Sequence, residues 1–160
     1  MLEQQLLNRV LPHLAGAITV AGYYPMKDEI DPLPILDALS RSGVTTALPW
    51  FGAQDARMMF RAGAVEVPGP WGVLQPADDA IAVVADLVLV PLVAADLGCN
   101  RIGQGKGHYD RALAHMRESG AVRTVGLAWD VQIVDQVIPA DAWDVPLDAV
   151  ATPDRWIEKP

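Results

Sequence analysis

The sequence has little of three things that would indicate other classes of protein: cysteine, positive charge and long apolar runs. Its single cysteine, Cys99, excludes an internal disulfide and a zinc site built from several thiolates. Twelve lysines and arginines against 20 aspartates and glutamates give a net charge of −8, which argues against nucleic acid or an anionic membrane as a partner. No apolar run reaches the ~18 residues that span a bilayer, since Asp86 and Pro91 interrupt the longest candidate, residues 80–95.

The composition is that of a folded domain. The 160 residues match the size of one ordinary domain, and 51% of them are apolar, which is enough to build a core. The N-terminus has no basic segment followed by an apolar one and a cleavage site, so we expect a cytoplasmic protein. We expect a single domain over residues 1–160, and a monomer.

Alternating apolar patterns predict an α/β domain with a mainly parallel central sheet and helices on both faces. The run 87–93 is apolar on both faces, as in a central, covered strand. Helices are predicted over 2–14, 31–42, 109–118 and 131–137, and strands over 18–24, 44–51, 87–93 and 122–129, with 150–152 as a last edge strand.

Residues 52–79 are rich in glycine and proline, and therefore in turns. Two short extended pieces, 58–61 and 64–67, are predicted to pair as a small antiparallel hairpin. A short helix is predicted over 79–84.

The stretch most informative about chemistry runs from Asp96 to Arg111, directly after the predicted central strand and into a helix. Loops at the carboxyl ends of parallel strands bind ligands in α/β sheets. Glycines alternate through residues 103–107, so the backbone can approach a ligand closely, and free N–H groups there suit phosphate oxygens. Arg101 and Lys106 add positive charge. The alternative is a glycine-rich turn made for tight packing.

Named nucleotide motifs do not fit this loop. A P-loop needs a glycine where Asn100 stands and a serine or threonine where Gly107 stands. A dinucleotide fingerprint needs a glycine where His108 stands.

The same stretch resembles the signature of the 5-formyltetrahydrofolate cyclo-ligase family, also called methenyltetrahydrofolate synthetase. The matching run is Val90-Pro91-x-x-Ala94-x-Asp96-x-Gly98-x-x-Arg101-x-Gly103-x-Gly105-x-Gly107-x-Tyr109-Asp110-Arg111-x-Leu113. Further pieces resemble the family in the same order, namely 23–31, Leu48-Pro49, Met58-x-Phe60, 69–76, Trp129-Asp130-x-Gln132 and 144–152. The resemblance covers residues 17 to 153.

This resemblance implies the activity and the ligands. Members bind MgATP and 5-formyltetrahydrofolate; the formyl oxygen attacks the γ-phosphate, and N10 then closes the ring as phosphate leaves. By position, the ATP site consists of Arg101, Ile102, Gly103, Gln104, Gly105, Lys106, Gly107, His108 and Tyr109, of which Arg101, Lys106 and Tyr109 are catalytic.

The resemblance also implies the folate and metal sites. Substrate contacts fall on Tyr24, Glu29, Gln104, Gly105, Lys106, Gly107 and His108, and apolar walls for the pterin on Met26, Trp50, Met58, Phe60 and Trp71. Magnesium falls on Asp110 and Asp148. The alternatives are that Asp110 only suits the helix dipole, and that Glu29 is only a solvated loop carboxylate.

The sequence departs from the family pattern at several positions. Members usually begin with a longer basic helix that reaches the ATP phosphates, whereas the predicted first helix holds only Arg9, so either the chain starts late or that contribution is missing. Ala95 replaces a phenylalanine, His108 the first tyrosine of a pair, and Gln75 a glutamate. Two alternatives therefore remain: an enzyme that acts on another substrate, and a protein that binds ATP or folate without turnover.

Overall fold

The computed structural model of the chain describes residues 1–160 and contains three α-helices and thirteen strands. The helices are α1 (Leu2–Val10), α2 (Leu33–Arg41) and α3 (His108–Ser119), and two 3-10 turns cover Leu11–Leu14 and Asp130–Gln132. The strands are β1 (Thr19–Ala21), β2 (Thr45–Trp50), β3 (Met59–Ala62), β4 (Val67–Pro68), β5 (Leu74–Gln75), β6 (Ala82–Val83), β7 (Leu87–Pro91), β8 (Ala94–Asp96), β9 (Arg101–Ile102), β10 (Arg123–Leu127), β11 (Ile133–Val134), β12 (Ala149–Ala151) and β13 (Trp156–Glu158).

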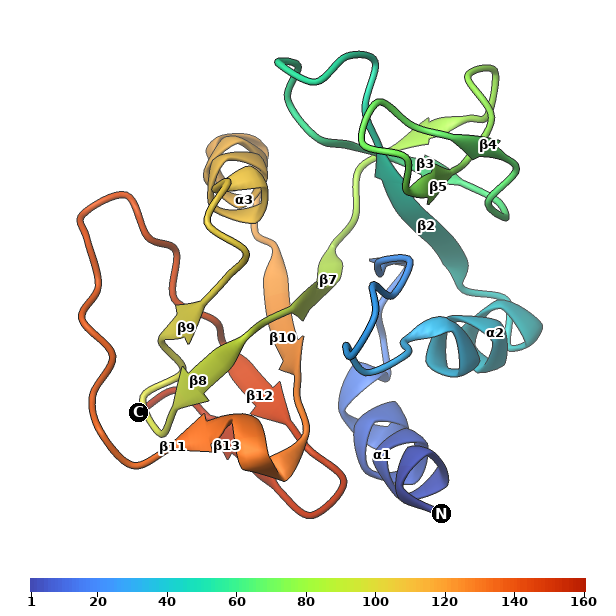
Figure 1. Cartoon of the computed structure of the whole chain (residues 1–160). Coiled ribbons are helices and arrows are strands. Elements are labelled where there is room, and N and C mark those ends of the chain that lie inside the picture. The colour runs from blue at the N-terminus through green and yellow to red at the C-terminus, as the bar shows by residue number, and fades with distance from the viewer.

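Eight strands form one sheet in the order β13-β12-β10-β7-β1-β2-β3-β6 (Figure 1). Its five central strands, from β12 to β2, are parallel, while β13, β3 and β6 join the two edges in the antiparallel sense. A small sheet, β11-β8-β9, and a hairpin, β4-β5, complete the fold. Since the parallel strands all point the same way, the loops after β1, β2 and β7 meet at one edge.

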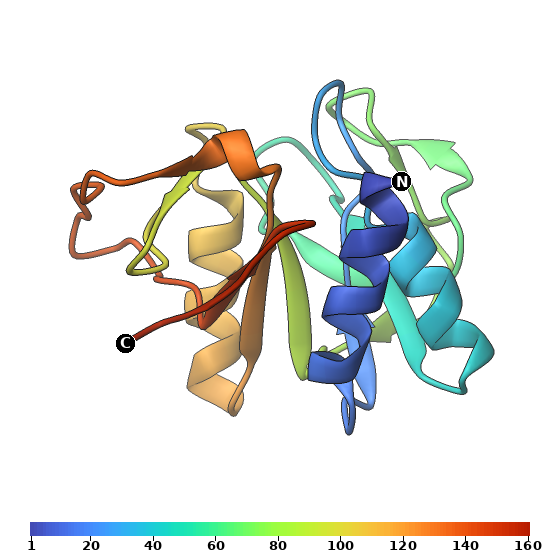
Figure 2. The ribbon, with the colours of Figure 1, turned by 90° about the horizontal axis from the view of Figure 1, so that it is seen from below.

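Alternate residues of β7 separate two cores. Leu87 and Leu89 belong to the core beneath α1 and α2, whereas Val88 and Val90 belong to the core beneath α3. Figure 2 shows α1 and α2 together on one side of the sheet and α3 apart from them. The period of two along a strand buried on both faces produces this arrangement, and it confirms the predicted α/β fold class. None of the helices is long and apolar enough to cross a bilayer.

The middle section contains the predicted small antiparallel hairpin, but other strands form it. β3 pairs with β2 and β6, and β4 pairs with β5 instead of with β3. The predicted helix over 79–84 is wrong as well: β6 pairs there with β3, and the Arg61 guanidinium donates to the carbonyl of Ala80 at 3.0 Å. Tertiary pairing overrides weak local preference in such short segments.

Two predictions in the C-terminal third are also wrong. Residues 131–137 do not form a helix, since Val131 and Val137 are about nine-tenths and four-fifths exposed and offer no face to bury. Instead β11 pairs with β8, and the Gln132 side chain donates to the carbonyls of Leu92 and Val93 at 2.9 and 3.1 Å. The strand predicted over 150–152 exists as β12, but it is not the edge, because β13 covers it.

The central position of β7 gives a stability prediction. Leu89 is fully buried in the core beneath α1 and α2. Replacing it with alanine removes apolar contacts and leaves a cavity, so we expect Leu89→Ala to lower the free energy of unfolding by about 2–5 kcal/mol. Urea unfolding followed by circular dichroism measures this change. Val84→Ala is the control, because Val84 is 76% exposed and a comparable loss there would contradict the burial argument.

Candidate active site

A cavity of about 610 Å³ lies at the edge where β1, β2 and β7 end. Tyr23 and Tyr24 come from the loop after β1, Phe51 follows β2, and Pro91 ends β7. Residues 101–110 form the opposing wall and lead into α3. The cavity therefore occupies the place where open α/β sheets bind ligands.

The glycine-rich loop presents free backbone donors to this cavity. No N–H group from Gly103 to Asp110 donates a hydrogen bond to a backbone carbonyl, and the first bond of α3 runs from Arg111 N–H to the carbonyl of Gly107. Gly105 and Gly107 have φ of +90° and +69°, which glycine adopts without strain. The loop conformation and the open start of α3 together form a cradle for an anionic ligand.

Charged side chains border the cradle on one side. Arg101 has a side chain only 7% exposed, and its guanidinium lies 3.3 Å from the Asp110 carboxylate. The same carboxylate oxygen accepts the N–H of Val145 at 3.0 Å, which attaches the segment containing Asp144 to the start of α3. The Nε of Arg101 is buried without a partner. Asp144 lines the cavity as Asp110 does, and its carboxylate accepts the N–H of Asp141 at 2.7 Å.

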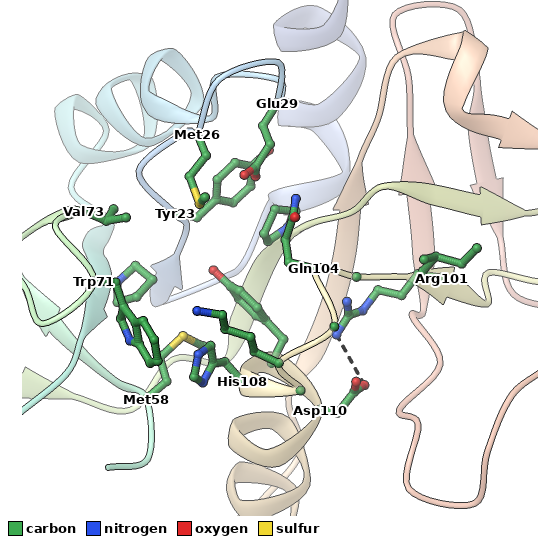
Figure 3. A pocket seen from close by; sticks show the side chains of 18 of the residues that line it. Tyr23, Met26, Glu29, Met58, Trp71, Val73, Arg101, Gln104, His108 and Asp110 are labelled. Carbon is green, nitrogen blue, oxygen red and sulfur yellow. Dashed lines mark hydrogen bonds and ion pairs between the residues drawn. The ribbon is translucent and has the colours of Figure 1, made fainter. Parts of the chain in front are cut away.

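Aromatic side chains gather on another side (Figure 3). The Lys106 ammonium lies 3.6 Å from the centre of the Trp71 ring, a cation–π contact. The His108 ring packs against Phe51 and Trp71, with centroid distances of 4.8 and 5.5 Å. Met58 lines the cavity beside these rings, and Met26 lines it nearer Tyr23. Flat rings and adaptable thioethers suit a planar aromatic ligand.

Glu29 approaches the cavity from the loop after β1. Trp129 Nε1 donates to the carbonyl of Asp28 at 3.2 Å, and the Tyr23 hydroxyl donates to the carbonyl of Ile30 at 2.7 Å, so both neighbours of Glu29 are fixed. Its Oε2 is buried without a hydrogen-bond partner. Burial raises the pKa of Glu29. A carboxylate held in this way is free to accept hydrogen bonds from a ligand.

Two tyrosines that line the cavity, Tyr109 and Tyr23, stay neutral. Burial raises the pKa of Tyr109 well above its usual value, the nearby Glu29 adds to this, and Arg101 opposes it. Burial and Glu29 likewise raise the pKa of Tyr23. Both residues therefore act as hydrogen-bonding or packing groups and not as anions.

The structure brings most of the sequence-predicted site residues together. All of residues 101–109 line the cavity, as do Tyr24, Glu29 and Asp110. Of the proposed pterin walls, Met26, Met58 and Trp71 line it, whereas Phe60 lies in the core and Trp50 stacks under the Arg61 guanidinium at 3.8 Å.

Asp148 lies elsewhere. Its carboxylate accepts the N–H of Thr124 at 2.8 Å and the Thr124 hydroxyl at 3.2 Å, at the start of β10. That is the opposite edge of the sheet from the cavity, so the structure does not bring Asp148 to Asp110. The other aspartate that lines the cavity is Asp144, the residue before Val145, whose N–H donates to Asp110.

Sequence reasoning missed several further cavity residues, among them Phe51, Gln75 and Trp143. Gln75 stands where the family pattern has a glutamate. Its amide oxygen accepts the N–H of Phe51 and its amide nitrogen donates to the carbonyl of Phe51, both at 3.1 Å. An ionised glutamate has no donor for the second bond, so the amide itself holds Phe51 in place.

Asp96, another signature residue, supports the loop from beneath. One carboxylate oxygen accepts the N–H groups of Gly98 and Asn100 at 2.9 and 3.0 Å, and the other accepts that of Ile138 at 2.8 Å. Burial alone raises the pKa of Asp96, but these bonds outweigh it, so its pKa lies below the usual value. Asp96 thus ties the start of the glycine-rich loop to the cavity residue Ile138.

The raised pKa of Glu29 gives a pH prediction. The folded chain binds this proton more tightly than the unfolded chain, whose glutamate has a pKa of about 4.5. The stability it contributes is therefore complete below that value and is lost as pH rises through the raised pKa. We expect the free energy of unfolding to decrease less with rising pH in Glu29→Gln than in the wild type. Urea unfolding across the range measures it, and exposed Glu66→Gln should behave as the wild type does.

Together, these features define an α/β protein with a ligand-sized cavity and a glycine-rich loop at the carboxyl edge of its parallel strands. A family model described as the 5-formyltetrahydrofolate cyclo-ligase family matches residues 1–153. The chain is 32% identical to the 5-formyltetrahydrofolate cyclo-ligase of Escherichia coli K12 over 162 residues, covering 95% of this chain and 88% of the relative. It is 31% identical to the enzyme of Mycolicibacterium smegmatis over 155 residues, covering 87% and 75%.

Solved structures agree with these matches. The 5,10-methenyltetrahydrofolate synthetase of Aquifex aeolicus superposes with a TM-score of 0.78 at 26% identity, covering 98% of this chain and 80% of that one. The synthetase of Mycoplasma pneumoniae shares the fold, with a TM-score of 0.72 at 24% identity over 95% of this chain and 85% of that one. The chain belongs to the 5-formyltetrahydrofolate cyclo-ligase family.

Proposed function

We propose that this protein uses ATP to convert 5-formyltetrahydrofolate into 5,10-methenyltetrahydrofolate, with release of ADP and phosphate. Family membership supports the folate reaction. The observation that carries ATP dependence is a single cavity that joins free backbone donors and cations to an aromatic wall. Two substrates, one anionic and one planar, can then meet in one cavity.

The residues divide between the substrates by chemistry. The phosphates of ATP accept hydrogen bonds from the N–H groups of residues 103–110. Arg101 and Lys106 supply local positive charge, because the protein's net charge of −8 would otherwise repel the phosphates. The pteridine ring packs against Met26, Met58 and Trp71, which line the cavity. The unpartnered Oε2 of Glu29 then accepts from the N–H groups at the edge of that ring.

The reaction needs activation because an amide-like oxygen is a poor leaving group. The formyl oxygen attacks the γ-phosphorus, the bond to the β–γ bridging oxygen breaks, and ADP leaves. The N10 lone pair then attacks the activated formyl carbon, phosphate leaves with the C–O bonding electrons, and N10 loses its proton. Lys106, Arg101 and the loop N–H groups hold the transferring phosphoryl group and stabilise its charge, so positioning and electrostatics supply most of the catalysis.

The donor set at one end of the cavity fits Mg²⁺. Two aspartates, Asp110 and Asp144, line the cavity, and hard oxygen ligands are those that Mg²⁺ prefers. The Asp144 carboxylate accepts one backbone N–H, that of Asp141, through Oδ2. Bound there with ATP, Mg²⁺ would neutralise charge on the phosphate oxygens. Asp148 is left out of this site, because Thr124 binds its carboxylate at the other edge of the sheet.

The proposal is tested by the absorbance of methenyltetrahydrofolate after the protein is mixed with 5-formyltetrahydrofolate, ATP and Mg²⁺. We expect the absorbance to rise only when ATP is present, with one ADP formed for each methenyl group. A rise that does not require ATP would contradict the phosphorylation step. No rise at all, with MgATP binding intact, would indicate another substrate or a binding protein without turnover.

A further inference from the structure

His108 sits in the cavity wall with one ring nitrogen bound and the other free. Its Nδ1 lies 3.2 Å from Nη2 of Arg111, one turn further along α3. Its Nε2 is buried and has no hydrogen-bond partner. The rings of Phe51 and Trp71 hold the imidazole in place, and Figure 3 shows His108 facing the cavity between Trp71 and the glycine-rich loop.

The arginine determines which nitrogen carries the proton. A guanidinium is always charged and has only donors, so Arg111 donates and Nδ1 must accept. A neutral imidazole that accepts at Nδ1 has its hydrogen on Nε2.

The backbone leaves room for this contact. Gly107, the residue before His108, lacks a Cβ, and a Cβ built there would lie 2.9 Å from Nη1 of Arg111. The guanidinium therefore packs directly over the last glycine of the loop while its other nitrogen reaches His108. An Nε2–H buried without a partner in the wall of a ligand cavity is costly unless a ligand supplies an acceptor.

We propose that Arg111 is a positioning residue that fixes His108 as an Nε2–H donor for an oxygen of the reacting phosphoryl or formyl group. The assignment of that oxygen rests on the proposed function. The imidazole donates and does not accept at this nitrogen, so it favours an oxygen that gains negative charge during phosphoryl transfer. Arg111 contributes through His108 and does not itself touch the substrate.

The first test is the tautomer of His108, which requires no activity. The chain has only three histidines, so nitrogen-15 NMR of the full-length protein can assign each ring by substitution. We expect the Nε2–H form for His108 in the wild type and a mixture of both forms in Arg111→Met. Arg117→Met is the matched control, because Arg117 lies on the same helix but pairs with Asp148. An Nδ1–H form in the wild type, or no change in Arg111→Met, would overturn the assignment.

The second test is a double-mutant cycle on the rate of methenyl formation. We expect Arg111→Met to lower kcat roughly tenfold, the size of effect that one lost hydrogen bond to a charged group has on a barrier. In a His108→Ala background the same change should have no further effect, because Arg111 then has nothing to position. Equal losses in both backgrounds would overturn the positioning role. An inactive wild type would count against the proposed function, while the NMR result would still decide the tautomer.

Discussion

Lys106→Ala is expected to lower kcat/KM for ATP by at least about 100-fold, the effect of removing a group that stabilises transition-state charge. The ammonium of Lys106 has no carboxylate within ion-pair distance and rests on the Trp71 ring at 3.6 Å. It is therefore free to turn to a phosphate group. Initial rates of methenyl formation at varied ATP concentration measure the change.

The control for this variant is Lys159→Ala. Lys159 is an exposed lysine near the C-terminus, outside the cavity, so its loss removes the same charge without touching the site. Both variants should unfold at the same urea concentration as the wild type. Equal rates in Lys106→Ala and the wild type would show that the glycine-rich loop does not hold the reacting phosphates.

Asp110→Asn and Asp148→Asn are expected to have different effects, because Asp110 belongs to the proposed Mg²⁺ site whereas the Asp148 carboxylate only stabilises the fold. Asparagine at 110 still accepts the N–H of Val145 but no longer offsets Arg101 or offers a charged ligand. We expect Asp110→Asn to lower the rate by about 100-fold at low Mg²⁺ and to raise the Mg²⁺ concentration needed for half-maximal rate. Asp148→Asn should stay within about threefold of the wild type.

The measurement is a Mg²⁺ titration of the initial rate at fixed ATP. Asp148→Asn should show its effect in unfolding instead, because the charge-assisted bond to the N–H of Thr124 weakens. A shifted Mg²⁺ requirement in Asp148→Asn, with none in Asp110→Asn, would place the metal at the other edge of the sheet and contradict the proposed Mg²⁺ site.

The glycine-rich loop and the two aspartates Asp144 and Asp148 show which parts of the site the sequence alone predicts. The glycine-rich loop could be predicted because alternating glycines, two cations and a following helix lie within one continuous stretch of chain. Asp144 and Asp148 both belong to the same C-terminal stretch, and only the fold decides which of them faces the cavity. The spacing of residues along a loop does not show which way a side chain points. The hydrogen bond from the N–H of Thr124 shows it for Asp148.

The same limit explains the other differences. The five central parallel strands and the helices on both faces follow from strong periodicity. The segments over 79–84 and 131–137, predicted as helices, are short, and their sequences do not show which strand each of them pairs with. Their pairing with β3 and β8 joins segments distant in sequence. Trp129 is a similar case, since its bond to the carbonyl of Asp28 joins residues 101 positions apart.

The most direct test of the central claim is the fate of the formyl oxygen. 5-Formyltetrahydrofolate labelled with oxygen-18 in its formyl group is converted in the presence of ATP and Mg²⁺, and the phosphate formed is analysed by mass spectrometry. The account predicts one labelled oxygen in each phosphate, because the formyl oxygen attacks the γ-phosphorus and leaves with it. Unlabelled phosphate formed together with methenyl product would contradict the account.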